Sequence, residues 1–183
     1  MRALPTPLAG LMLVERQPVG DARGSLARLF CSDSFSRWGW DGPVRQINHS
    51  TTTGQGTLRG MHFQFPPRAE TKLVTCLSGE VFDVAVDLRA GSPTFLVWHG
   101  VTLSADNRRS LLIPRGFAHG FQTLSAKAEL IYLHDADYAP QSEGGLSPLD
   151  PRLAIDWLLP VTTISDRDAA HPLIDDHFSG VQA

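Results

Sequence analysis

The chain has 183 residues, 19% of them charged, and a formal net charge of −3, which indicates a single domain over 1–183 and excludes a strongly basic, nucleic-acid-binding surface. Its two cysteines, Cys31 and Cys76, lie far apart, which favours a reducing cytoplasm and excludes a disulfide framework or a cysteine-built zinc site. Prolines and Glu15 interrupt the short apolar N-terminal stretch, so we expect neither a signal peptide nor a membrane span.

Short strand-like runs, set off by glycine, proline or polar clusters, follow one another along the chain. They cover 24–30, 43–52, 56–64, 71–89, 93–104, 110–125 and 128–138. Within 71–89, Ser78-Gly79-Glu80 predicts a hairpin turn between two strands. Helical periodicity is weak, near 31–39 and in the tail. The pattern predicts a mainly β jelly-roll barrel or β-sandwich, with a loop-rich C-terminal tail packed on it after Tyr138.

The stretch "RGMHFQFPP" at 59–67 carries polar side chains in what is otherwise a buried strand. Alternation places Met61 and Phe63 on one face and Gly60, His62 and Gln64 on the other. We expect the first face to pack in the barrel core and the second to form the wall of a polar cavity. Arg59 and His62 are three positions apart, and a bulge or twist at Gly60 would re-aim one of the two so that both serve the same cavity.

Residues 113–121, "IPRGFAHGF", have the form Pro-x-Gly-x-x-His, which resembles the second motif of cupins, small jelly-roll barrels. Cupins usually bind a metal through a first motif with His-x-His and a downstream glutamate. The matching stretch here is His62-Phe63-Gln64, followed by Glu70. Three possible ligands remain, His62, Glu70 and His119, and a metal site needs three or four. We therefore expect no metal, while a metal-dependent cupin such as a dioxygenase stays an alternative.

An ordered set of segments sharpens the resemblance. These are "DARG" (21–24), "QINHS" (46–50), "GTLRGMHFQ" (56–64), "KLVTCLSGEVFDVAVDLR" (72–89), "GSPTF" (91–95), "IPRGFAHGF" (113–121), the tyrosines at 132 and 138, "DP" (150–151) and "SDRD" (165–168). Together, over roughly 20–175, the chain resembles the dTDP-4-dehydrorhamnose 3,5-epimerases, which are cupin-type enzymes without a metal or other cofactor.

The resemblance implies an activity and an assembly. The expected reaction epimerises a nucleotide-linked 4-keto-6-deoxy sugar at carbons 3 and 5, converting dTDP-4-dehydro-6-deoxyglucose to dTDP-4-dehydrorhamnose. The expected partner is this nucleotide-diphosphate sugar, with no nucleic acid and no membrane. The family's usual assembly is a homodimer in which one subunit's N-terminal segment reaches the other's site.

The resemblance also implies catalytic roles. The ketone acidifies the protons on carbons 3 and 5, so the reaction needs a base on one face of the sugar, an acid on the other and stabilisation of the enolate oxygen. His62 matches the base, Asp168 the carboxylate that orients it, Tyr132 the proton donor and Lys72 the cation near the keto oxygen. Alternatives from the residues alone are a surface-turn aspartate, a core tyrosine and a solvated strand-edge lysine.

Further residues match positions that hold the substrate. Arginine suits diphosphate because its planar fork donates two hydrogen bonds. The matched set comprises Arg23 and Arg59 for the diphosphate, Tyr138 stacked on the base, Arg167 where the family often has lysine, and the ligand-contacting Gln46, Asn48, His119 and Glu143.

Arg28 departs from the family, which commonly has a glutamate there, in contact with the nucleotide end of the ligand. The reversed charge could add a phosphate contact or fit a base other than thymine. A CDP- or GDP-linked 4-keto sugar therefore remains open, as does a mono-epimerase acting at one carbon alone. A non-catalytic sugar-binding cupin is a further alternative, although the retained His62 and Tyr132 argue against it.

Overall fold

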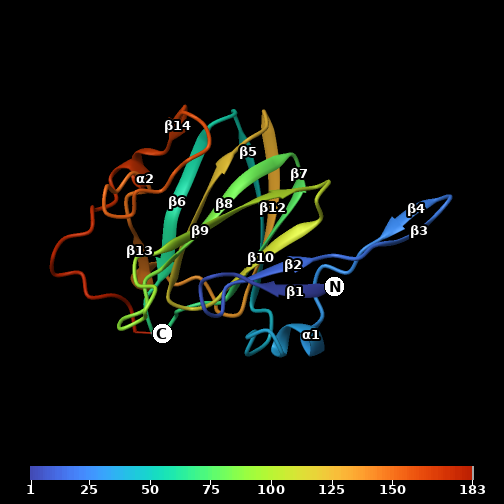
Figure 1. Ribbon diagram of the computed structural model, residues 1–183, viewed down its shortest axis with the longest axis horizontal. Coiled ribbons are helices and arrows are strands. Elements are labelled where there is room, and N and C mark those ends of the chain that lie inside the picture. The colour runs from blue at the N-terminus through green and yellow to red at the C-terminus, as the bar shows by residue number, and fades with distance from the viewer. Residues whose placement is uncertain (183) are drawn as a thin grey trace.

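The computed structural model describes residues 1–182, and two antiparallel sheets form its body (Figure 1). The first sheet has the order β1 (Arg2–Pro5), β2 (Met12–Glu15), β10 (Arg109–Ile113), β7 (Lys72–Ser78), β12 (Lys127–His134), β5 (Gln46–Thr53). The second has the order β13 (Glu143–Gly145), β6 (Thr57–Gln64), β11 (Phe117–Thr123), β8 (Glu80–Asp87), β9 (Trp98–Ser104), with β14 (Thr163–Ile164) parallel to β6. This is the expected cupin-type architecture.

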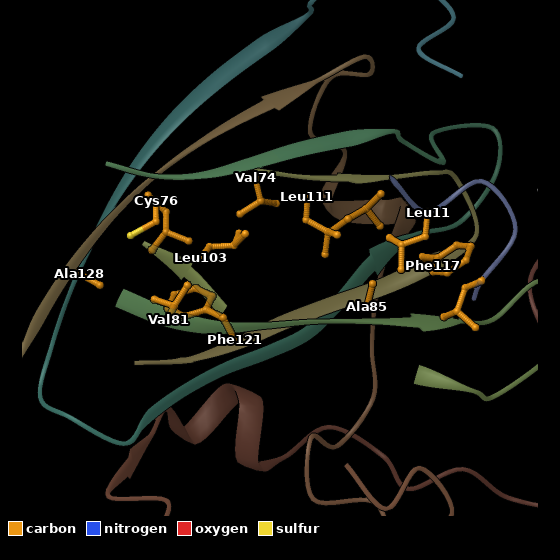
Figure 2. Close-up of a cluster of buried hydrophobic side chains, with 13 residues drawn as sticks. Leu11, Val74, Cys76, Val81, Ala85, Leu103, Leu111, Phe117, Phe121 and Ala128 are labelled. Atoms are coloured by element: carbon orange, nitrogen blue, oxygen red, sulfur yellow. The ribbon is translucent and has the colours of Figure 1, made fainter. Parts of the chain in front are cut away.

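Apolar side chains from the facing sheets fill the barrel interior. Val74 and Leu111 of the first sheet meet Ala85 and Phe121 of the second, and all four are at most 2% exposed (Figure 2). Burying such side chains stabilises the fold by roughly 1.5–3 kcal/mol for each large one. Polar side chains collect elsewhere between the same sheets.

The C-terminal tail covers the outer face of the second sheet. Met61 and Phe63 point to this side, where they pack with Leu146, Leu153 and Ile174 of the tail. The prediction that these two strand residues are buried is confirmed, but they lie beneath the tail and not in the barrel interior. Strand β8 is consequently buried on both faces, and apolar residues occur on both of its sides.

Residues 30–44 cover part of the first sheet's outer face. Helix α1 (Ser32–Ser36), inside the predicted helical region 31–39, supplies Phe35, which packs with Trp40 on Val14 and Leu73. The short β3 (Val19–Asp21) and β4 (Gly24–Leu26) form a hairpin that extends away from the sheets (Figure 1). No helix among the described residues is long and apolar enough to span a bilayer.

Several boundaries differ from the prediction. The run 110–125 is two strands because Pro114 has no N–H for the ladder and Gly116 turns the chain with φ +78°. Only Gly24–Leu26 of 24–30 is a strand, since the hairpin has no sheet to join. The turn at 78–80 is confirmed, with Gly79 at φ +73°. Strands β1, β2, β3, β13 and β14 were not predicted, as they are two to four residues long.

A bulge in β6 is confirmed at Gly60. His62 pairs with His119 of β11, but Arg59 pairs with Phe121, so three steps along β6 match two along β11. Gly60 has φ +129°, and a Cβ there would meet Gly120 of β11. The extra residue turns the Arg59 side chain to the side of the sheet that His62 faces.

Candidate active site

The histidine of the "RGMHFQ" stretch lies against a carboxylate from the end of the chain. His62 Nε2 stands 2.8 Å from Asp168 Oδ1, although 106 positions separate them in the sequence. Strand β14 pairs with β6 and so brings helix α2 (Asp166–Ala169) to this place. Ser165 caps the helix by accepting the Asp168 N–H at 3.1 Å, which fixes the aspartate's backbone.

The electrostatics of this pair fix its protonation. Burial raises the pKa of Asp168, but the hydrogen bonds from His62 and from the Gly60 N–H outweigh that effect and hold its pKa at about 2. The carboxylate is ionised at neutral pH and can only accept hydrogen bonds, so Nε2 of His62 must carry a proton. The lone pair of the neutral imidazole is then on Nδ1, the nitrogen available as a base.

A polar cavity of about 240 Å³ lies between the sheets beside His62. Strands β6 and β11 form one wall, and β5, β7 and β12 form the other. Its lining comprises Asn48, Ser50, Arg59, His62, Lys72, His119, Gly120, Phe121, Tyr132 and His134. Six of the thirteen predicted site residues therefore share one cavity, with His62 and Tyr132 on opposite walls.

Tyr132 is the side chain of the cavity that we expect to donate a proton. It pairs with Asn48 across β12 and β5. Its ring stacks on His134, with centroids 6.2 Å apart and planes at 19°, and lies edge-on to His119 at 6.0 Å. Removal from water raises its pKa, so the phenol is protonated at neutral pH.

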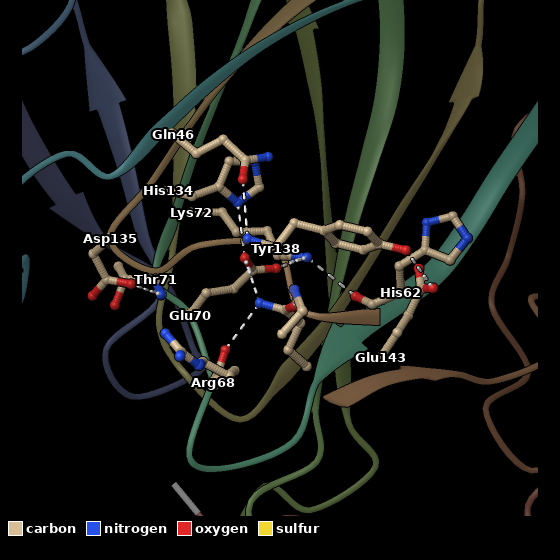
Figure 3. A network of polar contacts seen from close by, with 12 residues as sticks. Gln46, His62, Arg68, Glu70, Thr71, Lys72, His134, Asp135, Tyr138 and Glu143 are labelled. Carbon is tan, nitrogen blue, oxygen red and sulfur yellow. Dashed lines mark hydrogen bonds and ion pairs between the residues drawn. The ribbon is translucent and has the colours of Figure 1, made fainter. Parts of the chain in front are cut away.

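Lys72 is buried, 6% exposed, on an interior strand, and the alternative of a solvated strand-edge lysine is wrong. Its Nζ lies 3.0 Å from Glu70 Oε1 and donates to the His62 carbonyl at 3.3 Å (Figure 3). The other Glu70 oxygen contacts His134 Nδ1 at 3.0 Å and accepts from Gln64 at 3.1 Å. Burial raises the pKa of Glu70, but Lys72 and His134 outweigh this and hold it at about 2. The buried cation thus has a fixed counter-charge.

The metal ligands considered from the sequence are engaged separately. Glu70 binds Lys72 and His134, and His119 Nε2 contacts Asp83 Oδ2 at 2.9 Å. These partners leave His62, Glu70 and His119 without a common point for an ion.

Polar residues continue from the cavity to the surface. Tyr138, 53% exposed, donates its hydroxyl to Glu143 at 3.0 Å, and its backbone N–H donates to Gln46 at 3.0 Å (Figure 3). Glu143 also accepts from Arg167 at 2.6 Å. Four more of the predicted residues therefore form one chain of contacts.

A second hollow, of about 610 Å³, adjoins the first. Arg59 and His62 line both, and Arg167 and Asp168 line the second together with threonines of β5 and β6. Arg59 is exposed and donates to Thr52 at 3.3 Å. An arginine between two adjoining hollows is suited to bind an anion that extends through both.

Arg23 and Arg28 lie outside both hollows. Arg23 is on the projecting hairpin, where it forms an exposed ion pair with Asp21 at 2.6 Å. Arg28 follows the hairpin and is also exposed. Within this one chain, the fold does not bring either residue to His62.

Sequence reasoning missed His134 and His171 as neighbours of the site. His134 shares the alternating face of β12 with Tyr132, which is a signal that could have found it. His171 lies in a loop, where alternation gives no information.

Comparison with known proteins agrees with this architecture. A curated dTDP-4-dehydrorhamnose 3,5-epimerase from Salmonella typhimurium is 43% identical over 177 residues, 96% of each chain. A dTDP-6-deoxy-D-glucose-3,5-epimerase from Legionella pneumophila, solved with dTDP-4-keto-L-rhamnose, superposes with a TM-score of 0.91 at 41% identity, over 100% of this chain and 98% of that one. A dTDP-4-dehydrorhamnose 3-epimerase from Streptomyces niveus is 39% identical, over 92% of this chain and 81% of its own.

Fold and relatives together make this protein a cupin-type isomerase. The sequence profile of the dTDP-4-dehydrorhamnose 3,5-epimerases matches residues 5–176. The chain belongs to the dTDP-4-dehydrorhamnose 3,5-epimerase family.

Proposed function

We propose that this epimerase converts dTDP-4-dehydro-6-deoxyglucose to dTDP-4-dehydrorhamnose by inverting carbons 3 and 5. The observation that carries the proposal is that His62, in contact with Asp168, and Tyr132 lie on opposite walls of one polar cavity. Inversion needs a base on one face of the sugar ring and an acid on the other. Both carbons neighbour the 4-keto group, so one such pair serves both.

His62 is the proposed base. Its Nδ1 lone pair takes the proton from the carbon next to the ketone, and the ring becomes an imidazolium. Asp168, held ionised by the Gly60 N–H and by His62, stabilises this positive charge across 2.8 Å. The aspartate is a positioning residue, since it acts through the histidine.

Lys72 is the proposed partner of the enolate. Proton removal places negative charge on the keto oxygen, and a buried cation stabilises it more than an exposed one would. Tyr132 then donates its phenolic proton to the carbon from the opposite face. Each inversion transfers one proton from the sugar to His62 and one from Tyr132 to the sugar, and exchange with water restores both groups.

The diphosphate is proposed to bind Arg59, between the cavity and the larger hollow. The nucleotide is proposed to reach the Tyr138, Glu143 and Arg167 contacts, with its base stacked on Tyr138. Gln46, Asn48 and His119 are proposed to orient the sugar. The exposure of the Tyr138 ring and the position of the exposed Arg59 in the lining of both hollows support these roles.

A homodimer is proposed for the assembly. The β3–β4 hairpin exposes Val19 by 78% and Leu26 by 80%, which is costly for a monomer and suited to a second copy. In that arrangement Arg23 and Arg28 reach the partner's site, where they bind phosphate.

A single domain over 1–183 is also proposed, and one core cluster that joins Leu8 and Leu11 with Leu130 supports it. Two free thiols support the cytoplasm as its location.

The proposed function is tested by product analysis. The protein is incubated with dTDP-4-dehydro-6-deoxyglucose, the product is reduced with borodeuteride, and NMR identifies the sugar. We expect the L-rhamno configuration at carbons 3 and 5, and substitution of His62→Ala should abolish its formation while calorimetry still detects dTDP binding. Inversion at carbon 3 alone, or full activity of His62→Ala, would contradict the proposal.

A further inference from the structure

A second histidine lies beside the His62–Asp168 pair. His171 follows helix α2, and its Nε2 stands 3.7 Å from Asp168 Oδ1. Its ring centroid is 5.6 Å from that of His62, with the planes at 76°. The Nε2 atom is buried and has no hydrogen-bond partner among residues 1–182. Buried ring nitrogens normally have a partner, so this one calls for an explanation.

The His171 ring occupies space that is free because residue 145 is a glycine. Gly145 of β13 is the register partner of His62 across β13 and β6. A Cβ at Gly145 would overlap three atoms of the His171 ring, including both nitrogens. Any larger residue at Gly145 would therefore push the imidazole away from His62 and Asp168.

We propose that His62 Nε2, Asp168 Oδ1 and His171 Nε2 form a binding site for a divalent transition-metal ion such as Zn²⁺. The three donor atoms lie within 4.8 Å of one another, and no other such group of histidine, cysteine and acidic side chains occurs among residues 1–182. Two imidazoles and one carboxylate suit Zn²⁺, which binds three protein ligands and keeps a fourth position open at about 2.0–2.2 Å bond lengths. The donors need only small side-chain movements to surround the ion.

The charge state of the donors fits a cation. Burial, and then the neighbouring His62, lower the pKa of His171, so its imidazole is neutral at pH 7 and has a free lone pair. Asp168 is ionised, since its pKa is about 2. Arg167 is a cation beside the site, with its Nε 4.0 Å from Asp168 Oδ1, and Glu143 compensates its charge at 2.6 Å.

Metal binding has a chemical consequence at His62. The ion takes the Nε2 lone pair and displaces the proton that Nε2 shares with Asp168. The neutral imidazole then carries its proton on Nδ1, which can no longer accept one from the sugar. The metal is therefore a reversible inhibitor. This inhibition rests on the proposed function, whereas binding of the ion does not.

Calorimetry without substrate tests the site. Zn²⁺ is titrated into chelator-treated wild type, His171→Asn, and the control His49→Asn, which alters a surface histidine 3.2 Å from a single carboxylate, Glu129. We expect one ion per chain in wild type and in the control. Because even loss of an outer partner weakens metal sites about 10–100-fold, His171→Asn should weaken binding at least about 10-fold.

Three further measurements keep the proposal refutable. Gly145→Ala retains all three ligands but displaces the His171 ring, and it should weaken Zn²⁺ binding as His171→Asn does. Co²⁺ in wild type should give the visible absorption of a four-coordinate N/O site, and His171→Asn should not. Without Zn²⁺, we expect His171→Asn to turn over substrate as fast as wild type. Zn²⁺ should inhibit wild type but not His171→Asn. Equal Zn²⁺ affinity of wild type and His171→Asn, or no binding to wild type, would overturn the proposal.

Discussion

Replacing Asp168 by Asn should prevent His62 from acting as a base although His62 itself is unchanged. In the native site one carboxylate oxygen accepts the Gly60 N–H at 3.0 Å and the other faces His62 Nε2. An asparagine must keep its single oxygen on Gly60, which turns its NH₂ group toward Nε2. The imidazole nitrogen must then accept that hydrogen bond, and its own proton moves to Nδ1. The reactive nitrogen is thereby protonated in the resting enzyme.

The size of the effect follows from two terms. Loss of a charge-assisted hydrogen bond to the imidazolium costs about 1.5–3 kcal/mol, or roughly 10–150-fold in rate. The unfavourable tautomer adds to this, and in hydrolases the same change lowers kcat about 10⁴-fold. We therefore expect kcat of Asp168→Asn to fall by about 10²–10⁴-fold, with a smaller change in KM because the carboxylate faces the histidine and not the cavity.

The assay is loss of the carbon-bound proton to deuterated water, followed by NMR, at saturating substrate. Asp166→Asn is the matched control, since it removes the same charge from the exposed side of the same short helix. The control should retain wild-type exchange. Wild-type kcat in folded Asp168→Asn would refute the reasoning from the Gly60 contact.

The remaining predictions concern the other cavity groups and acid stability. Tyr132→Phe should still exchange substrate protons with deuterated water but form inverted product at least about 100-fold more slowly, as NMR would measure; undiminished inversion would exclude Tyr132 as donor. Lys72→Met should lower kcat about 100-fold and, by leaving Glu70 buried without its cation, destabilise the fold by about 3 kcal/mol; an unchanged melting temperature would contradict this. The pKa of Asp168 is depressed from 3.8 to about 2, so its contribution to folding is present above pH 4 and lost as the pH falls toward 2. Between pH 7 and pH 2, the free energy of unfolding measured in urea should therefore fall by about 2 kcal/mol less in Asp168→Asn than in wild type. An equal fall in the two proteins would contradict the linkage.

Local patterns predicted the strands that carry the site. The run 56–64 places His62 and Gln64 on a polar face, and the glycine before Met61 makes the bulge that the spacing required. Alternation succeeds in these strands because the two sides of each strand meet different surroundings. Alternation predicted that Met61 and Phe63 are buried, but not that they are buried under the C-terminal tail. The sheet face that the tail covers is determined by contacts with residues 80 or more positions away.

The rest of the site depends on tertiary contacts that no local pattern encodes. Glu70 and His134 meet only because β7 and β12 are neighbours in the first sheet. His171 reaches Asp168 because Gly145 leaves space for its ring. Arg23 matched a phosphate-binding position, yet the hairpin carries it away from its own cavity, since β3 and β4 pair only with each other among residues 1–182.

Counting the deuterons gained by the sugar tests the central claim most directly. Wild type and His62→Asn are each incubated with dTDP-4-dehydro-6-deoxyglucose in deuterated water, and mass spectrometry with NMR locates the label. The account predicts two deuterons in wild type, one each at carbons 3 and 5, and none above background in His62→Asn. A single labelled carbon in wild type, or equal labelling by His62→Asn, would contradict a double epimerase that uses His62 as its base.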